Sequence, residues 1–319
     1  MSYIQTGLQG SGTPEDPFIL NSYADWKIID AGYTGAGDVP PHYKLMNDID
    51  MYAEHELFEG KDFLLGTLHM NNHSIMNAKL KPEGFAIRNC TVIGGPLEIL
   101  KGNGKVSQVG GEGKITNMTG TQVAMIFANC YFERVFLDID ATNMWFNNFA
   151  SLTGQIAGLQ CYIRIKNEGI NNAPLIGCKR MDERASFKDC CFEFNGNAFS
   201  YSFIEQTYIS MGIDVILDHC MVCGSVDCYD MLYKYDSQEA PYVIRGGVRS
   251  CAFDIYAKNS RDERGWKEYA MLYDMQSGPS IAVSRKDLYV GGIIERVTPS
   301  EFRNPDILAS KGFDVYKTR

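Results

Sequence analysis

The sequence predicts an all-β fold, a single right-handed parallel β-helix closed by short helical or irregular caps. Three observations support this prediction. A cysteine-centred pattern recurs about every 30 residues, apolar clusters recur between its copies, and the 3.6-residue periodicity of amphipathic helices is missing. Because a unit of about 30 residues cannot bury a hydrophobic face by itself, such units must stack on one another.

The repeat consists of two mostly polar residues, a cysteine and then alternating apolar positions. Its clearest copies, 29 to 31 residues apart, are centred on Cys130, Cys161, Cys190, Cys220 and Cys251. An earlier copy at Cys90 precedes the first of these by 40 residues, and the interval contains the glycine-rich stretch 101–114. We therefore expect a loop insertion in that coil of the helix.

Strand alternation assigns the two faces of each repeat. If the repeat cysteines point inward together with the residue two positions later, they form two internal columns. Such cysteines are expected to be reduced, because neighbouring parallel side chains fit disulfide geometry poorly. The outward positions Glu133, Arg164 and Glu193 then form a ladder of alternating charge on successive coils, continued by Cys223 and Asp254. Its simplest interpretation is a solvated surface.

The N-terminal region carries a more specific pattern. Residues 10–26 (GSGTPEDPFILNSYADW) indicate a turn, a strand and a capped short helix, and the strand patterns 42–51 and 65–75 follow. This order resembles the opening of bacterial and phage right-handed β-helix proteins of the pectate-lyase-like, GLUG-repeat type. The sequence departs from that family at Met70-Asn71-Asn72, where Asp-Gly-Asn-Gly is usual. The resemblance implies the fold and leaves the function open, since such solenoids serve many functions.

The expected organisation has three parts. Residues 1–29 form an N-terminal segment with the capping helix, and residues 30–297 form the β-helix with its insertion at 101–114. Residues 298–319 form a closing segment, which the resemblance implies to be helical.

Charge and composition exclude several classes of protein. With 30 basic and 39 acidic residues the net charge is −9, so no basic face for a nucleic acid is expected. No apolar run approaches the roughly 18 residues of a membrane span, and residues 1–20 lack the pattern of a signal peptide. Neither a phosphate-binding loop nor a G-x-S-x-G motif is present, so no cofactor is expected. We therefore expect a protein that folds in a cytosol.

One cluster superficially resembles a zinc site. His219, Cys220, Cys223 and Cys228 have the spacing H-C-x2-C-x4-C. However, Cys220 occupies the inward position of the repeat, and Cys223 should face outward on the same strand. A column of buried thiols is therefore favoured over a metal site.

Two pairs of carboxylates are candidates for glycoside hydrolysis, which needs two such groups facing one sugar. Asp138 and Asp140 share one face of a predicted strand, and Asp214 and Asp218 lie beside a turn. Acidic residues on the outside of a β-helix ordinarily solvate it, so neither pair is assigned a catalytic role.

Aromatic residues provide the remaining functional indication. Tyr131, Tyr162 and Met221 are predicted to point outward in one column, where they would form an apolar strip for a subunit contact. The alternative for the two tyrosines is that their side chains pack beneath the 101–114 loop or a terminal segment.

These observations favour a non-enzymatic structural component of a tailed-phage virion, in a capsid decoration, a fibre or the tail. Virion parts assemble in the host cytoplasm and need no secretion signal, whereas bacterial surface adhesins do. The expected partners are other virion proteins and further copies of the chain, with a trimer as one arrangement and a host-surface glycan as a further ligand. The alternative is a carbohydrate-active enzyme on the same fold, a polysaccharide depolymerase or lyase, or a glycan-binding adhesin.

Overall fold

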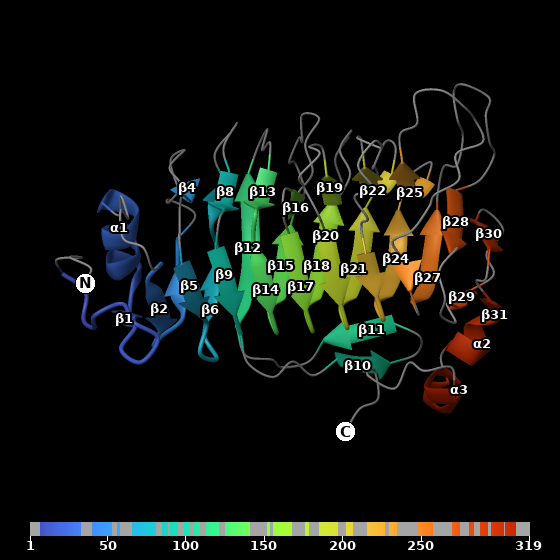
Figure 1. Ribbon diagram of the computed structural model, residues 1–319, viewed down its shortest axis with the longest axis horizontal. Coiled ribbons are helices and arrows are strands. Elements are labelled where there is room, and N and C mark those ends of the chain that lie inside the picture. The colour runs from blue at the N-terminus through green and yellow to red at the C-terminus, as the bar shows by residue number, and fades with distance from the viewer. Residues whose placement is uncertain are drawn as a thin grey trace.

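The computed structural model is a parallel β-solenoid whose successive coils contribute strands to three parallel sheets (Figure 1). Strands predominate and helices are few, which confirms the all-β solenoid. The structure describes residues 7–32, 40–52, 56–57, 66–80, 85–88, 90–94, 99–102, 105–108, 113–120, 125–140, 152–153, 156–167, 176–178, 185–196, 202–206, 216–226, 230–234, 248–249, 251–257, 270–274, 281–283, 288–292, 295–302 and 304–310.

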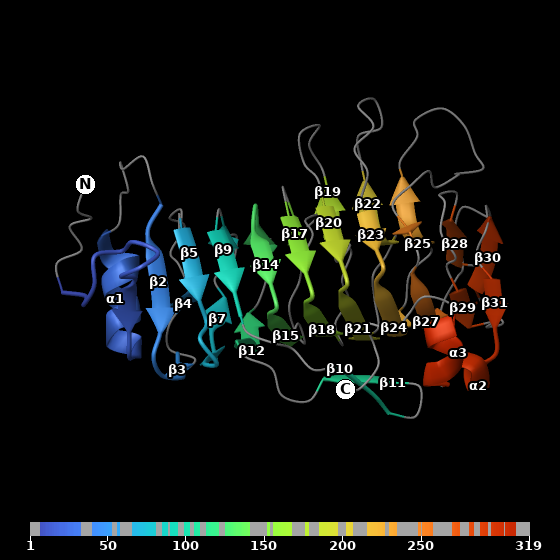
Figure 2. The same cartoon turned by 60° about the horizontal axis from the view of Figure 1, so that its bottom comes forward.

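The nine-stranded sheet runs along one side of the solenoid (Figure 2). Its strands, in spatial order, are β1 (Phe18–Leu20), β2 (His42–Leu45), β5 (Gly66–His69), β9 (Cys90–Ile93), β14 (Tyr131–Glu133), β17 (Ile156–Leu159), β20 (Ala185–Lys188), β23 (Ile216–Asp218) and β26 (Val248–Arg249). Every neighbouring pair in this order is parallel.

The twelve-stranded sheet forms the second side, and its strands are also parallel. In spatial order they are β3 (Ile49–Asp50), β6 (Ser74–Met76), β12 (Lys114–Gly120), β15 (Phe136–Asp140), β18 (Tyr162–Asn167), β21 (Cys191–Gly196), β24 (Met221–Val226), β27 (Ala252–Ala257), β29 (Ile281–Val283) and β31 (Glu295–Val297). The short strands β4 (Glu56–Leu57) and β7 (Lys79–Leu80) complete it, with β7 paired to β12.

The third side is a six-stranded parallel sheet of β8 (Phe85–Arg88), β13 (Met125–Ala128), β16 (Leu152–Thr153), β19 (Ile176–Cys178), β22 (Ser202–Gln206) and β25 (Asp230–Lys234). Two further strands, β28 (Ala270–Asp274) and β30 (Leu288–Gly292), pair in parallel. Between β9 and β12 the chain forms an antiparallel hairpin of β10 (Ile99–Gly102) and β11 (Lys105–Gln108). This hairpin overlaps the stretch 101–114, where a loop insertion was expected.

Alternation within each strand builds the interior. In the twelve-stranded sheet the register stacks fully buried side chains in one column, namely Ile49, Ile75, Ile115, Leu137, Ile163, Phe192, Val222 and Phe253. Phe192 meets Phe187 of the nine-stranded sheet edge-to-face, with ring centroids 5.1 Å apart. Gly158, the neighbour of Phe187, leaves room for this ring, since an added Cβ would lie 2.7 Å from it. Full burial of each large apolar side chain contributes about 1.5–3 kcal/mol.

The repeat cysteines form two internal columns at different corners of the coil. A column predicted from the repeat is confirmed for Cys161, Cys190, Cys220 and Cys251, all of which are fully buried. The prediction that Cys130 belongs to it is wrong. Val135 aligns with Cys161, because the next residues of the two coils pair in register. Cys130 lies beside Cys90 instead, and their Sγ atoms are 3.6 Å apart.

The error has a local structural cause. Asn129 and Gln160, which precede Cys130 and Cys161, both have a φ of 53°. This left-handed conformation turns the chain sharply between two strands. The first turn joins the six-stranded to the nine-stranded sheet, whereas the second joins the nine-stranded to the twelve-stranded sheet. Arg134, with the same φ, makes the second kind of turn in the earlier coil.

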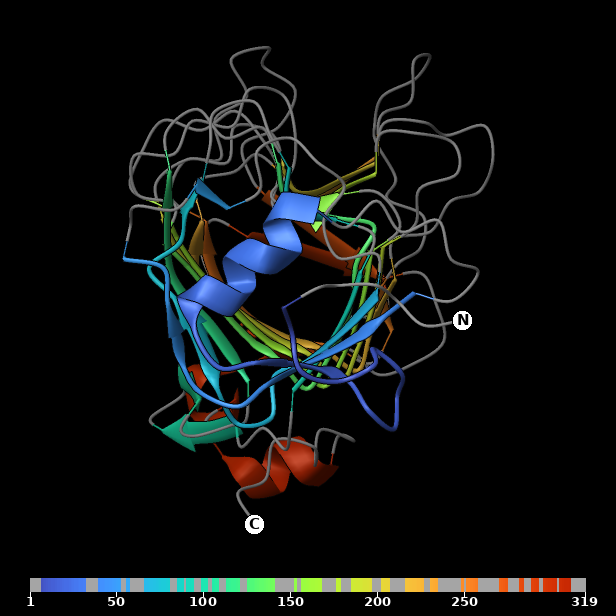
Figure 3. The ribbon, with the colours of Figure 1, turned by 90° about the vertical axis from the view of Figure 1, so that its left-hand side faces the viewer.

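A helix covers the N-terminal end of the solenoid (Figure 3). In α1 (Tyr23–Gly32) the side chain of Ser22 accepts a hydrogen bond from the backbone N–H of Asp25, while the Asp25 carboxylate accepts one from Ser22 at 3.1 Å. This reciprocal cap starts the helix. Trp26 and Ile29 of this helix are buried at the end of the solenoid.

Two short helices follow the last strand, as the resemblance implied for this segment. In α2 (Pro299–Phe302) and α3 (Pro305–Ser310) the first turns are capped by Thr298 and Asn304. Both helices lie outside the solenoid (Figure 3), and Phe302 and Leu308 in them are buried. None of the helices in the described ranges is long and apolar enough to cross a membrane.

The last strand of the twelve-stranded sheet ends the apolar pattern. By register Arg296 of β31 follows Phe253 and Ala282 in the inward column, yet it is exposed. Glu295 beside it is also exposed. A charged residue therefore stands where earlier coils have aliphatic or aromatic side chains.

Candidate functional site

The charged ladder lies on the outer face of the twelve-stranded sheet. Register places Arg164, Glu193, Cys223 and Asp254 on successive strands, as predicted. The prediction that Glu133 heads this ladder is wrong, because the turn at Arg134 puts it on the nine-stranded sheet. Asp138 takes that place, directly opposite Arg164.

Asp138 and Arg164 form a two-point ion pair. The guanidinium Nε donates to one carboxylate oxygen at 2.9 Å and a terminal nitrogen donates to the other. The guanidinium also lies over the Phe136 ring, 5.3 Å from its centroid. The hydrogen bond with Asp138 raises the pKa of Arg164, against an opposing effect of partial burial. Both oxygens of Asp138 are thus engaged within the sheet.

Tyr162 and Glu193 continue this network. The Tyr162 hydroxyl donates a hydrogen bond to a carboxylate oxygen of Glu193. Burial, and secondly this bond, raise the pKa of Tyr162 far above its usual value. The phenol therefore stays protonated and acts as a donor at physiological pH.

The structure describes three of the four predicted carboxylates. Asp138 and Asp140 lie two residues apart on β15, and by register Arg164 and Lys166 lie opposite them on β18. Asp218 ends β23 in a different sheet and is half-buried. The remaining candidate, Asp214, lies outside the described residues.

The zinc-like cluster is split across the sheet. Cys220 belongs to the internal column, and burial is the main cause that raises the pKa of its thiol. Cys223 lies on the opposite face, as predicted, but is only 5% exposed, with its Sγ 3.6 Å from the Phe192 carbonyl oxygen. The ring of His219 contacts Asp189 at 2.7 Å, and Cys228 lies outside the described residues. In the described part of the chain, no group of three His, Cys, Asp or Glu side chains is arranged to hold a metal ion.

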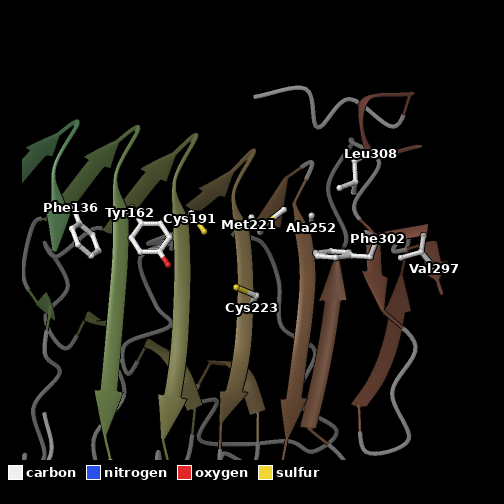
Figure 4. Close-up of a cluster of buried hydrophobic side chains, with 9 residues drawn as sticks. All are labelled: Phe136, Tyr162, Cys191, Met221, Cys223, Ala252, Val297, Phe302 and Leu308. Carbon is white, nitrogen blue, oxygen red and sulfur yellow. The ribbon is translucent and has the colours of Figure 1, made fainter. Parts of the chain in front are cut away.

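An apolar strip on the same outer face is buried (Figure 4). We call it the outer apolar strip, and its members are Phe136, Tyr162, Cys191, Met221 and Ala252. Val297, Phe302 and Leu308 of the C-terminal segment belong to the same cluster. The hairpin strand β11 contacts β24 from outside (Figure 1). Segments remote in sequence therefore cover this face.

This arrangement corrects the predicted subunit contact. Tyr131 is in the nine-stranded sheet and does not share a column with Tyr162 and Met221. Tyr162 and Met221 do point out of the solenoid, but they are only 1% and 0% exposed. Tyr162 and Met221 therefore belong to a buried cluster and form no exposed strip.

The exposed apolar side chains lie elsewhere. Among the described residues the large apolar side chains that are exposed are Met46, at 42%, and Tyr52, at 65%. Both lie in the first coil. Tyr52 has a φ of 54°, a conformation that is uncommon for a bulky residue, and the Asp50 carboxylate holds its backbone N–H at 2.7 Å. Its ring meets Tyr23 edge-on at 6.3 Å.

A histidine pair on the nine-stranded sheet was missed from the sequence. His42 Nδ1 of β2 lies 3.0 Å from His69 Nε2 of β5, and the rings are within 21° of parallel. Lys44 stands directly opposite His69. Burial, then His42 and Lys44, lower the pKa of His69. Aligning the two predicted strands, His-Tyr-Lys and Thr-Leu-His, would have brought these groups together.

The fold and these contacts define a three-sided parallel β-solenoid with a paired-charge outer face. No protein-family model matches the chain. Halomucin of Haloquadratum walsbyi is 28% identical over 120 residues, which are 38% of this chain and 1% of halomucin. The chain thus spans a very small part of that relative. A solved structure of a Bacteroides ovatus protein provisionally named an immunoglobulin A1 protease aligns with 78% of this chain and 86% of its own, at 15% identity and a TM-score of 0.35.

Proposed function

We propose that this β-solenoid is a non-enzymatic structural protein that works by assembly with other proteins, as a part of a tailed-phage virion. The observation that carries the proposal is the exposed pair Met46 and Tyr52 in the first coil. Exposed aromatic and methionine side chains are enriched in protein interfaces. The positive φ of Tyr52 costs about 1–3 kcal/mol of conformational free energy, and strain of this kind is typical of binding sites.

The state of the carboxylates supports the same proposal. A glycoside hydrolase needs one carboxyl group that can give up a proton and another that can attack or activate water. Asp138 is instead held at both oxygens by Arg164, and Glu193 accepts the Tyr162 hydroxyl. These contacts suit a stable outer wall. Further copies of the chain, for example in a trimer, and other virion proteins are the proposed partners.

The test compares charged substitutions at two exposed places. Tyr52→Glu and Met46→Glu should reduce assembly of the purified chain, or its incorporation into particles, by at least about tenfold. Ser186→Glu, on an exposed position of β20, is the matched control and should change neither. Light scattering coupled to size-exclusion chromatography and electron microscopy of particles measure the outcome.

A degradation assay supplies the opposing result. The purified protein should release no oligosaccharides from surface polysaccharides. Release that disappears in Asp138→Ala or Asp214→Ala would replace the proposal with the carbohydrate-active enzyme.

A further inference from the structure

Three groups able to carry positive charge converge on the outer face of the nine-stranded sheet. The strands β2 and β5 lie side by side (Figure 2). His42 and Lys44 lie two residues apart on β2, and His69 of β5 contacts the first and pairs in register with the second. All three side chains are half-buried. Once the histidine pair takes up a proton, its positive charge repels the ammonium of Lys44 unless another group compensates it.

Among the residues that the structure describes on the two neighbouring strands, β1 and β9, none is an acid in register with this cluster. In the column of Lys44 and His69, β1 presents Ile19 on one side and β9 presents Ile93 on the other. The next residue in that column, Glu133, already contacts Arg134 at 2.9 Å. Beside His42, the adjoining column continues with hydroxyl groups, Thr67 and Thr91, and then Tyr131.

We propose that His42, Lys44 and His69 form a binding site for a doubly charged oxyanion, of the sulfate or phosphate class. The proposal is independent of the assembly role. The ammonium of Lys44 provides one charge, and one proton added to the histidine pair provides the second. The hydroxyl of Thr67, on the strand of His69, is the neutral donor nearest to the pair by register.

The histidine pair explains how the site would be switched on. In the neutral pair one ring N–H is used between His42 Nδ1 and His69 Nε2, so one of the two remaining nitrogens is a donor and the other an acceptor. Adding one proton keeps the bond between the rings and makes both remaining nitrogens donors. His69 Nδ1 then carries an N–H beside Lys44, and a charge-assisted hydrogen bond to an oxyanion becomes available.

Proton uptake and anion binding must therefore be linked. Burial, His42 and Lys44 all oppose protonation of His69, and a bound dianion would offset these effects. Affinity should rise as the pH falls through the histidine range, because free protein must gain a proton to bind.

Sulfate is the suitable probe, since its own charge does not change in this range. Titration of the full chain, followed by NMR of the histidine ring protons, should show binding at least about tenfold tighter at about pH 5.5 than at about pH 8. Lys44→Gln and His69→Gln should each weaken binding at the lower pH at least about fivefold. Lys188→Gln, an exposed lysine farther along the same sheet, is the matched control and should bind like the unmodified protein.

Three results would overturn the proposal. Equal affinity at the two pH values would remove the proton linkage, and equal weakening by Lys188→Gln would reduce the site to general surface charge. Acetate binding as tightly as sulfate would show that a single negative charge suffices. Circular dichroism of each variant distinguishes lost binding from lost folding, and His42→Gln provides a second, independent disruption of the pair.

Discussion

The outer faces of two neighbouring sheets differ in how far their side chains are buried. On the twelve-stranded sheet, Tyr162 and Met221 are buried in a cluster that includes C-terminal residues, and Asp138 is paired with Arg164. On the nine-stranded sheet, His42, Lys44 and His69 are gathered together and half exposed. Both sheets share the same parallel stacking and similar interior columns. The difference teaches that stacking determines the fold, while coverage of the outer face decides which side of the solenoid can meet a partner.

The largest expected effect comes from placing a charge in the covered face. Tyr162→Asp should lower the free energy of unfolding by about 3–5 kcal/mol, because the new carboxylate is buried beside Glu193. Tyr131→Asp, on the open sheet, should cost under about 1 kcal/mol. Urea unfolding followed by circular dichroism compares the two. Equal losses would mean that the two faces are equally covered.

A smaller effect is expected from breaking the ion pair. Arg164→Met leaves the Asp138 carboxylate without its partner, and should cost about 1 kcal/mol after allowance for solvent screening of the half-exposed guanidinium. Adding Asp138→Asn should recover part of this loss. The double-mutant cycle, measured by urea unfolding, isolates the pair, and a coupling of zero would show that the ladder contributes nothing to stability.

The open face should make stability depend on pH. Because the pKa of His69 is lowered in the folded protein, the unfolded chain binds more protons as the pH falls below about 6.5. The contribution of His69 to the free energy of unfolding is present above about pH 6.5, and it is lost as the pH falls towards the pKa of His69 in the folded protein. His69→Gln should therefore flatten the fall in melting temperature between about pH 7 and pH 5. An unchanged profile would contradict the assignment.

The last prediction concerns the oxidation state of the buried cysteines, for which we expect no disulfide bond. Mass spectrometry of alkylated, unreduced protein should find each cysteine of the internal column free, namely Cys161, Cys190, Cys220 and Cys251. Burial raises the pKa of Cys161 and Cys220 and so suppresses the reactive thiolate. Two of these residues paired with each other would contradict the prediction.

The sequence was a good guide where the period is constant. From Cys161 to Cys251 each coil has almost the same length, so alternation alone identifies the inward column. It failed at Cys130 because the same turn chemistry, a residue at positive φ followed by cysteine, serves two different corners. Local pattern cannot distinguish corners that are related only through the three-dimensional coil.

Coverage of the outer face was less accessible to prediction. Met221 alternates as an outward residue should, yet it is buried in a cluster that also contains Phe302 and Leu308 of the C-terminal helices, and the inserted hairpin contacts its strand. Contacts across such separations leave no periodic trace in the sequence. The histidine pair is a different case, because His42 and His69 lie in strands that were both predicted, and only their mutual register was needed.

The exposed arginine at the end of the inward column bears on how long such a structure can grow. Parallel strands with unpaired edges are templates for fibril formation, since each added chain recreates the edge it has just occupied. Arg296 on β31 would have to lose its water to accept another coil above it. The charge at this position therefore opposes the stacking of a second molecule on this end of the twelve-stranded sheet.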